Sequence, residues 1–169
     1  QGLIQFKQTV NYIKRKHPCI LIIADAKRGD IGNTATKYAK TFFETYSCDA
    51  ITLAPYMGKP SITPFLEYQD KWSIILDHTS EGYEDLQDFH IEESGDLVYE
   101  HILRRSLQAG ATQYNSMFVV GATVATAFEF VRKIVPYHFL LVPGVGEQGG
   151  SLEEVAKYGL NSTCGLLVN

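Results

Sequence analysis

The sequence predicts an α/β protein built around a parallel sheet. Three observations favour this class. Short apolar runs alternate with amphipathic segments along the 169 residues, the spacing between runs leaves room for helical crossovers, and polar clusters fall where the expected strands end. Strict alternation of this kind indicates parallel strands joined by helices. Two architectures fit the pattern, an open doubly wound sheet and a (β/α)8 barrel.

The first half of the chain supplies three of the expected strands. An amphipathic helix comes first, because apolar residues recur on one face over residues 3–16. The continuous apolar run at 19–24 is typical of a strand that is buried on both faces. The alternation then predicts, in order, a helix over 34–46, a strand over 50–54, a short helix over 60–69 and a strand over 72–76.

The second half begins with a polar, acidic stretch at 81–95, which we expect to form a long loop. A helix over 124–135 carries its apolar residues on one stripe. Another helix begins at Ser151, where Glu154 completes a capping box, and Gly159 is its expected C-terminal stop. The remaining expected elements are a helix over 96–109 that ends near Gly110 and strands over 117–120, 139–142 and 165–168.

This pattern gives six strands, whereas a complete (β/α)8 barrel has eight strands and about 250 residues. The chain also opens on a helix at Gln1 and closes on a strand. We therefore expect residues 1–169 to form a single partial barrel domain, a fragment that lacks two N-terminal strands and the material after its last strand.

The composition is that of an ordinary globular protein, with 45% hydrophobic and 20% charged residues. The net charge is −4, from 15 basic and 19 acidic residues without a basic run, so neither nucleic acid nor an anionic membrane is an expected partner. No apolar run has the length of a membrane span. The three cysteines have unrelated spacings, which favours free thiols in a reducing, cytosolic compartment.

The densest polar cluster follows the first expected strand and contains Asp25, Lys27 and Asp30. Asp25 and Lys27 are two residues apart, so in an extended chain they project to the same side. Asp30 follows Gly29, which permits a turn. Two carboxylates can therefore flank one ammonium at the C-terminal edge of the sheet. Such a cluster is typical of an α/β active site, although a salt bridge at the rim would give the same spacing.

A glycine-rich segment, Pro143–Gly150, lies between an expected strand and an expected helix. Its glycines let backbone N–H groups approach a phosphate, and the helix N-terminus favours an anion. The segment also matches the dinucleotide-binding pattern GxGxxG. That interpretation requires an acidic residue about 20 positions later, and residues 159–169 contain none. A phosphate-binding loop and a plain glycine-rich turn both remain open.

Weaker clusters follow three other expected strands, at 55–58, 79–82 and 121–123. Each alone fits ordinary turn chemistry. Together they place polar residues at the C-terminal strand ends, where barrel enzymes have their active sites. The five histidines lack metal-ligand spacing, so no metal site is expected.

Residues 25–35, DAKRGDIGNTA, resemble the signature of the orotidine 5′-monophosphate (OMP) decarboxylases. The resemblance continues in order through 52–58, 79–80, 120–123 and 143–150, and so covers essentially the whole chain. It implies a (β/α)8 barrel, with about six of the eight strands present here, that acts as a cytoplasmic homodimer with shared active sites. It also implies conversion of OMP to UMP and carbon dioxide, the last step of pyrimidine synthesis, without a metal or an organic cofactor.

The resemblance assigns catalytic roles to Asp25, Lys27 and Asp30. Lys27 is implied to be the general acid that protonates C6 as carbon dioxide leaves. Asp25 is implied to crowd the substrate carboxylate and to hold Lys27, and Asp30 to reach the active site of the partner subunit. A preorganised ammonium suits this chemistry, because it stabilises the negative charge left on carbon and then supplies the proton.

The resemblance also implies a set of substrate-binding residues. Ile31 and Thr34 would serve the neighbouring subunit's site, and Ser80 would contact the pyrimidine. A loop would close over base and phosphate, with Gln148 as its main side-chain contact. The loop residues concerned are Pro143, Gly144, Val145, Gly146 and Gln148.

The chain departs from the family pattern in three places. A second catalytic lysine and a ribose-binding aspartate would precede Gln1, and a phosphate-binding arginine would follow Asn169, so we expect this chain alone to be inactive. Glu81-Gly82 replaces the usual asparagine and one further residue before glycine. Two alternatives stay open: a magnesium-dependent sugar-phosphate lyase that shares the DxKxxD pattern, and a non-catalytic barrel that binds a phosphorylated ligand.

Overall fold

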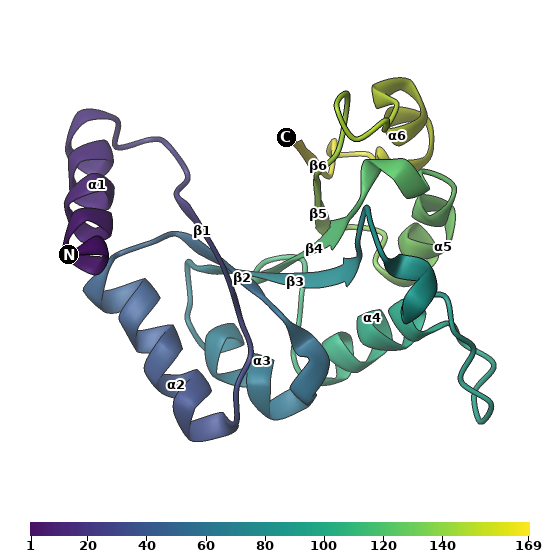
Figure 1. The fold of residues 1–169 in the computed structure, drawn as a ribbon, viewed down its shortest axis with the longest axis horizontal. Coiled ribbons are helices and arrows are strands. Elements are labelled where there is room, and N and C mark those ends of the chain that lie inside the picture. The colour runs from purple at the N-terminus through teal and green to yellow at the C-terminus, as the bar shows by residue number, and fades with distance from the viewer.

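The computed structural model describes all 169 residues as six strands with helices packed around them (Figure 1). The sheet order is β1-β2-β3-β4-β5-β6, so each strand pairs with the next one along the chain, and every pair is parallel. A doubly wound sheet would reverse its strand order at a switch point. The uninterrupted order is that of a barrel wall, in which β1 and β6 are the unpaired edges.

The strands and helices have the following bounds. The strands are β1 (Ile23–Arg28), β2 (Ala50–Leu53), β3 (Trp72–His78), β4 (Ser116–Val120), β5 (Phe139–Val142) and β6 (Leu166–Val168). The helices are α1 (Gly2–Lys16), α2 (Gly32–Lys40), α3 (Lys59–Leu66), α4 (Val98–Gln108), α5 (Ala127–Ile134) and α6 (Leu152–Gly159).

The first strand is the main correction to the sequence-based expectation. It begins at Ile23 rather than Cys19, and it extends through Arg28. The first strand pairing joins Ile23 to Ala50, so the preceding apolar residues have no strand beside them. Ile20 and Leu21 are accordingly 53% and 42% exposed. As a result, Asp25 and Lys27 lie within β1 instead of after it.

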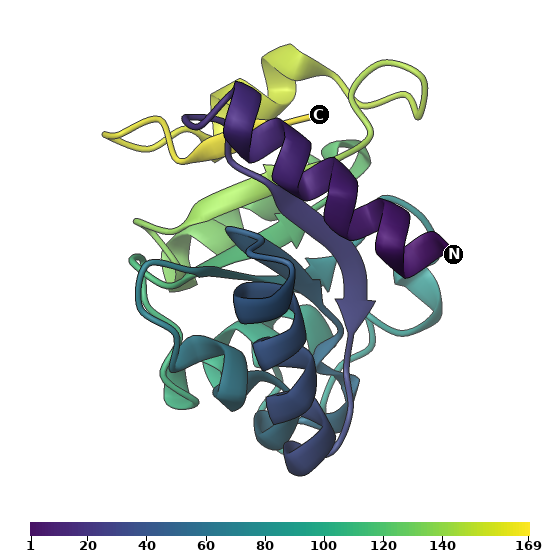
Figure 2. The same ribbon diagram turned by 90° about the vertical axis from the view of Figure 1, so that its left-hand side faces the viewer.

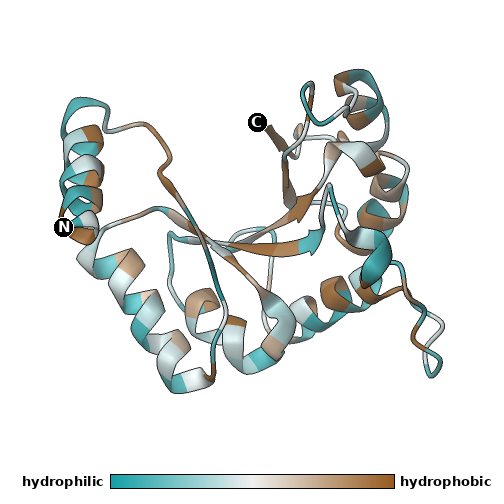
Figure 3. Ribbon diagram, viewed as in Figure 1, coloured by the Kyte–Doolittle hydropathy of each residue, from teal (hydrophilic) through white to brown (hydrophobic).

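The sheet has an apolar side chain layer on each face. The larger core lies between the strands and the surrounding helices and includes Leu53, Ile75, Phe118 and Phe128. A smaller cluster on the other face consists of Ala50, Ile74, Met117 and Val119. Figures 1 and 2 show α2, α3 and α4 together on one side of the sheet. The strands are largely apolar, but β1 and β3 turn hydrophilic toward their C-terminal ends (Figure 3).

Helix α6 begins and ends where the sequence predicts. The reason for glycine at its C-terminal end differs from the expected one. Ser151 Oγ accepts a hydrogen bond from the Glu154 main-chain N–H at 3.3 Å, as an N-cap should. Gly159 is the last helical residue. A Cβ atom at this position would lie 2.7 Å from the ring of Phe128. Glycine is therefore required by close packing against α5, not by a left-handed turn.

Arg132 of α5 connects the segments at the N-terminal ends of β5 and β6. Its guanidinium donates hydrogen bonds to four main-chain carbonyls: Val135 at 3.3 Å, His138 at 2.7 Å, Gly159 at 2.7 Å and Gly165 at 2.8 Å. Burial lowers the pKa of Arg132 to about 10, which leaves it charged at neutral pH. Contacts at this end of a barrel serve stability, because active sites lie at the opposite end.

Candidate active site

A cavity of about 610 Å³ opens at the C-terminal ends of the strands. Its walls contain five of the residues that the sequence singled out: Asp25, Lys27, Ser80, Pro143 and Gln148. Apolar side chains from the inner face of the sheet, including Leu76, Val119 and Leu141, line its floor. Segments far apart in the sequence therefore meet at one site, where an α/β barrel holds its active site.

Lys27 and Asp25 form a close ion pair in this cavity. Lys27 Nζ lies 2.6 Å from Asp25 Oδ1 and 2.7 Å from Asp25 Oδ2. Both side chains are more than half exposed, at 54% for Lys27 and 64% for Asp25, so a ligand in the cavity can reach either group. Hydrogen bonding to the Lys27 ammonium holds the pKa of the Asp25 carboxyl below its usual range. Asp25 is therefore a carboxylate at neutral pH.

A bulge in β1 gives the pair its geometry. Ala24 pairs with Ile51 and Arg28 pairs with Leu53, so β1 uses four residue steps where β2 uses two. Lys27 adopts a φ of 45° within the bulge, a left-handed value that is uncommon for a residue other than glycine. Bulges of this kind are over-represented beside active sites, where they redirect a side chain.

Thr52 of β2 holds the bulge in place and was missed by the sequence interpretation. Its hydroxyl accepts a hydrogen bond from the Lys27 main-chain N–H and donates one to Asp25 Oδ1, both at 2.9 Å. The Thr52 residue is only 2% exposed. The available sequence signal was a single hydroxyl in the otherwise apolar strand 50–53, which strand packing alone does not require.

A second bulge lies near the C-terminal end of β3. Leu76 pairs with Val119 while His78 pairs with the next residue, Val120, so Asp77 is the extra residue. Asp77 is buried without a hydrogen-bond partner, and burial raises the pKa of its carboxyl well above the usual range. The bulge changes the direction of the chain just before Thr79 and Ser80, both of which line the cavity.

Ser80 is packed against the end of β4. A Cβ atom at Gly121 would lie 2.6 Å from the Ser80 Cα, so this position requires glycine for close approach. Thr123 Oγ1 donates a hydrogen bond to the Ser80 carbonyl at 2.9 Å. The polar cluster at 121–123, which alone fits ordinary turn chemistry, thus supports a residue of the cavity.

The glycine-rich loop that follows β5 is folded on itself. Gly144, Gly146 and Gly149 have φ values of 95°, 86° and 89°, which favour glycine strongly. The Gly150 main-chain N–H donates to the Gly144 carbonyl at 3.0 Å, and the Gly146 N–H donates to the Gly150 carbonyl at 3.1 Å. Pro143 and Gln148 of this loop line the cavity, whereas Gly144, Val145 and Gly146 do not.

Asp30, Ile31 and Thr34 also lie outside the cavity. Asp30 Oδ1 accepts a hydrogen bond from the Ile31 main-chain N–H at 2.8 Å, just before α2 begins. Ile31 is 61% exposed, although it is a large apolar residue. Of the two carboxylates that the spacing places around Lys27, only Asp25 pairs with it in this chain.

No group of three or more His, Cys, Asp or Glu side chains is arranged to hold a metal ion. No helix has both the length and the apolar character needed to cross a membrane.

Comparison with known proteins identifies the family. The sequence model of the orotidine 5′-phosphate decarboxylase / HUMPS family matches residues 2–163. The chain is 58% identical to the orotidine 5′-phosphate decarboxylase of Phocaeicola vulgatus, over 100% of this chain and 62% of that protein. It is 57% identical to that of Bacteroides fragilis, over 100% of this chain and 61% of that protein. The chain thus spans about three fifths of the length of these curated relatives.

Solved structures agree with this assignment. The Leishmania donovani OMP decarboxylase matches with a TM-score of 0.83 and 36% identity, over 96% of this chain and 64% of that chain. The Leishmania donovani UMP synthase matches with a TM-score of 0.88 and 36% identity, over 99% of this chain and 37% of that chain. The OMP decarboxylase neighbours are (β/α)8 barrels, so the six strands are part of such a barrel. The chain belongs to the orotidine 5′-phosphate decarboxylase / HUMPS family.

Proposed function

We propose that the protein containing this chain decarboxylates OMP to UMP and carbon dioxide, the last step of pyrimidine nucleotide synthesis. The observation that carries the proposal is the ion pair of Lys27 and Asp25, held in the cavity at the C-terminal ends of the strands. Membership of the family and the high identity to curated OMP decarboxylases support it. The chain alone is expected to be inactive, because the resemblance assigns further substrate contacts to residues that this sequence does not contain.

Lys27 and Asp25 divide the chemical step between them. Asp25 is ionised, so it repels the carboxylate of OMP while holding the Lys27 ammonium beside C6. When the bond from C6 to the carboxylate breaks, carbon dioxide leaves and the electron pair remains on C6. Lys27 stabilises that charge and then transfers its proton to C6. A fixed ammonium can supply both effects, so the proposed reaction needs neither a metal nor an organic cofactor.

Ser80 and the loop from Pro143 to Gln148 bind the rest of the substrate in this proposal. Ser80 contacts the pyrimidine, and Gln148 reaches base and phosphate as the loop closes. The presence of Ser80, Pro143 and Gln148 in the lining of one cavity supports these roles. Binding free energy from the distant phosphate then helps to close the site and promotes the chemical step.

We propose a homodimer in which Asp30, Ile31 and Thr34 enter the active site of the partner subunit. Their position outside their own cavity supports this arrangement, as does the exposure of Ile31. We further propose that residues 1–169 form one partial barrel domain of a cytoplasmic enzyme, since one continuous core joins residues from Val10 to Val155.

Turnover of OMP by the full-length protein tests this function. The loss of OMP is followed by ultraviolet absorbance in buffer that contains a chelator of divalent metals. We expect UMP to form at an undiminished rate with the chelator present. A folded full-length protein that leaves OMP intact, but cleaves a sugar phosphate when magnesium is added, would instead be the related lyase.

A further inference from the structure

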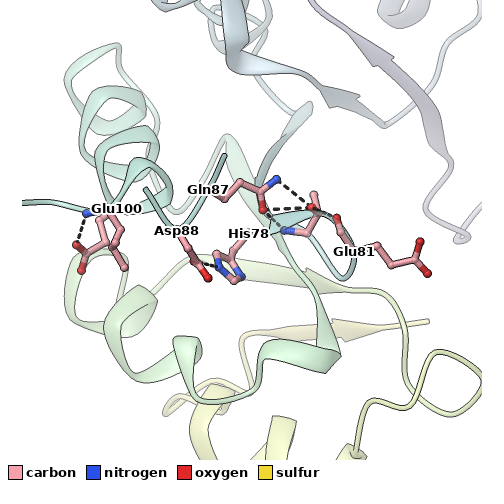
Figure 4. A network of polar contacts seen from close by, with 7 residues as sticks. His78, Glu81, Gln87, Asp88 and Glu100 are labelled. Carbon is pink, nitrogen blue, oxygen red and sulfur yellow. Dashed lines mark hydrogen bonds and ion pairs between the residues drawn. The ribbon is translucent and has the colours of Figure 1, made fainter. Parts of the chain in front are cut away.

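The acidic segment between β3 and α4 is attached to the end of β3 by two consecutive side chains. Gln87 Oε1 accepts a hydrogen bond from the Thr79 main-chain N–H at 2.8 Å, and Gln87 Nε2 donates one to Thr79 Oγ1 at 2.9 Å (Figure 4). The Thr79 hydroxyl donates in turn to the Glu81 carbonyl at 3.1 Å. One amide therefore satisfies both the main chain and the side chain of Thr79.

Asp88 makes the second attachment. Its Oδ1 lies 2.8 Å from Nε2 of His78, the residue before Thr79 (Figure 4). The His78 side chain is 3% exposed and packs against the rings of Tyr83 and Tyr99, with centroids 5.0 Å and 4.6 Å away. Gln87 and Asp88 thus contact Thr79 and His78 in reverse order, which attaches the segment to two neighbouring residues at the end of the strand.

The next residue after this anchored pair is Ser80, which lines the cavity. Gly121 and Thr123, which follow β4, contact Ser80, and the Gly121 main-chain N–H donates a hydrogen bond to the His78 carbonyl at 2.8 Å, so this side holds the carbonyl end of the peptide between His78 and Thr79. Gln87 holds the N–H end of the same peptide and also the hydroxyl of Thr79, which no residue from the β4 side contacts by a hydrogen bond. The direction in which Ser80 enters the cavity thus depends on a side chain seven residues further along the chain.

We propose that Gln87 is a positioning residue for Ser80 and sets where Ser80 meets the substrate base, a role that rests on the proposed function. The amide of Gln87 does not touch the cavity, since Thr79 and Ser80 line it and Gln87 does not. It acts only by fixing Thr79. Misplacement of a substrate contact by about 1 Å can cost on the order of 100-fold in rate.

Gln87→Leu removes both hydrogen bonds to Thr79 while keeping a side chain of similar size. We expect kcat/KM for OMP to fall about 10- to 100-fold. Gln87→Glu keeps an acceptor for the Thr79 N–H and can accept from its hydroxyl, so it should restore activity to within about 3-fold of the wild type. Gln108→Leu is the matched control, because Gln108 bonds only to Arg105 on the exposed end of α4. It should leave kcat/KM unchanged.

A double-mutant cycle separates positioning from a general loss of structure. If Gln87 acts through Ser80, then Gln87→Leu should have little further effect in a Ser80→Ala background, so the two losses overlap. Losses that multiply in the double variant would overturn the proposal. Equal kcat/KM for Gln87→Leu and the wild type would overturn it as well.

The resonance of the Ser80 main-chain amide provides a readout that does not depend on activity. In the ligand-free full-length protein, Gln87→Leu should shift or broaden this resonance, whereas Gln108→Leu should not. An unchanged Ser80 resonance would refute the positioning role even if OMP is turned over. A shifted resonance in a protein without OMP turnover would retain the structural role and reject only the proposed function.

Discussion

Replacing Lys27 with alanine is expected to lower kcat for OMP decarboxylation by about 10³- to 10⁴-fold. The variant loses the ammonium that stabilises the charge on C6 and also the proton that completes the reaction. Asp25 would then lie in the cavity without its partner, and its carboxylate would repel the substrate without compensation. Binding of UMP, which lacks the carboxylate, should change by less than about 10-fold, because most of its contacts come from elsewhere.

Steady-state kinetics and titration with UMP on full-length Lys27→Ala and wild-type protein make the comparison. Lys133→Ala is the matched control, since Lys133 is an exposed residue of α5 whose ammonium lies over the ring of Phe130. It should retain wild-type kcat. A wild-type protein that binds UMP but turns over no OMP, with or without Lys27, would favour the non-catalytic phosphate-binding barrel.

Arg132→Ala is expected to lower the free energy of unfolding by about 3–5 kcal/mol, the largest stability effect that we expect from a single residue. The guanidinium donates to four carbonyls at once. Its removal takes the side-chain donor from the Val135, His138 and Gly159 carbonyls in a buried region, whereas the Gly165 carbonyl keeps the hydrogen bond that it accepts from the Leu140 main-chain N–H. Arg132→Lys should recover only part of the loss, because one ammonium cannot match the planar fork of donors.

Urea unfolding of the full-length variants measures this effect, and activity at low temperature should be retained because Arg132 lies at the opposite end of the strands from the cavity. Arg104→Ala serves as the control. Arg104 is 51% exposed and pairs with Asp96 at 3.4 Å, so its removal should cost less than about 1 kcal/mol. If Arg132→Ala and Arg104→Ala lower the free energy of unfolding by similar amounts, the prediction is wrong, because the four carbonyl contacts then contribute no more than one exposed ion pair.

The fold could be predicted from the sequence because its signals are local. Each parallel strand is a short apolar run, and each crossover helix carries its own apolar stripe. Strand β1 is the exception. The most apolar run, at 19–22, lies outside β1, whereas the charged residues Asp25 and Lys27 lie within it. Strand limits follow from where the neighbouring strand begins, which is a long-range property that the run itself does not contain.

The site was predictable only in part, because some of its features depend on contacts between residues that are distant in sequence. Asp25, Lys27 and the glycine-rich loop stand out as clusters of unusual residues at strand ends. Thr52 and Gln87 do not, because each acts through a hydrogen bond to a residue that is distant in sequence or across a long loop. The bulges in β1 and β3 were also hidden, since a bulge depends on the register between two strands.

Mixing two inactive variants tests the central claim most directly. In our account each site uses Lys27 and Asp25 from one subunit and Asp30 from the other. Lys27→Ala and Asp30→Ala subunits of the full-length protein, mixed under conditions that exchange subunits, should form hybrid dimers with one intact site. The mixture should regain about a quarter of the wild-type rate of OMP decarboxylation, the statistical value for a two-fold dimer. If mass spectrometry shows hybrid dimers and the mixture stays as inactive as its parents, the shared site that we propose is wrong.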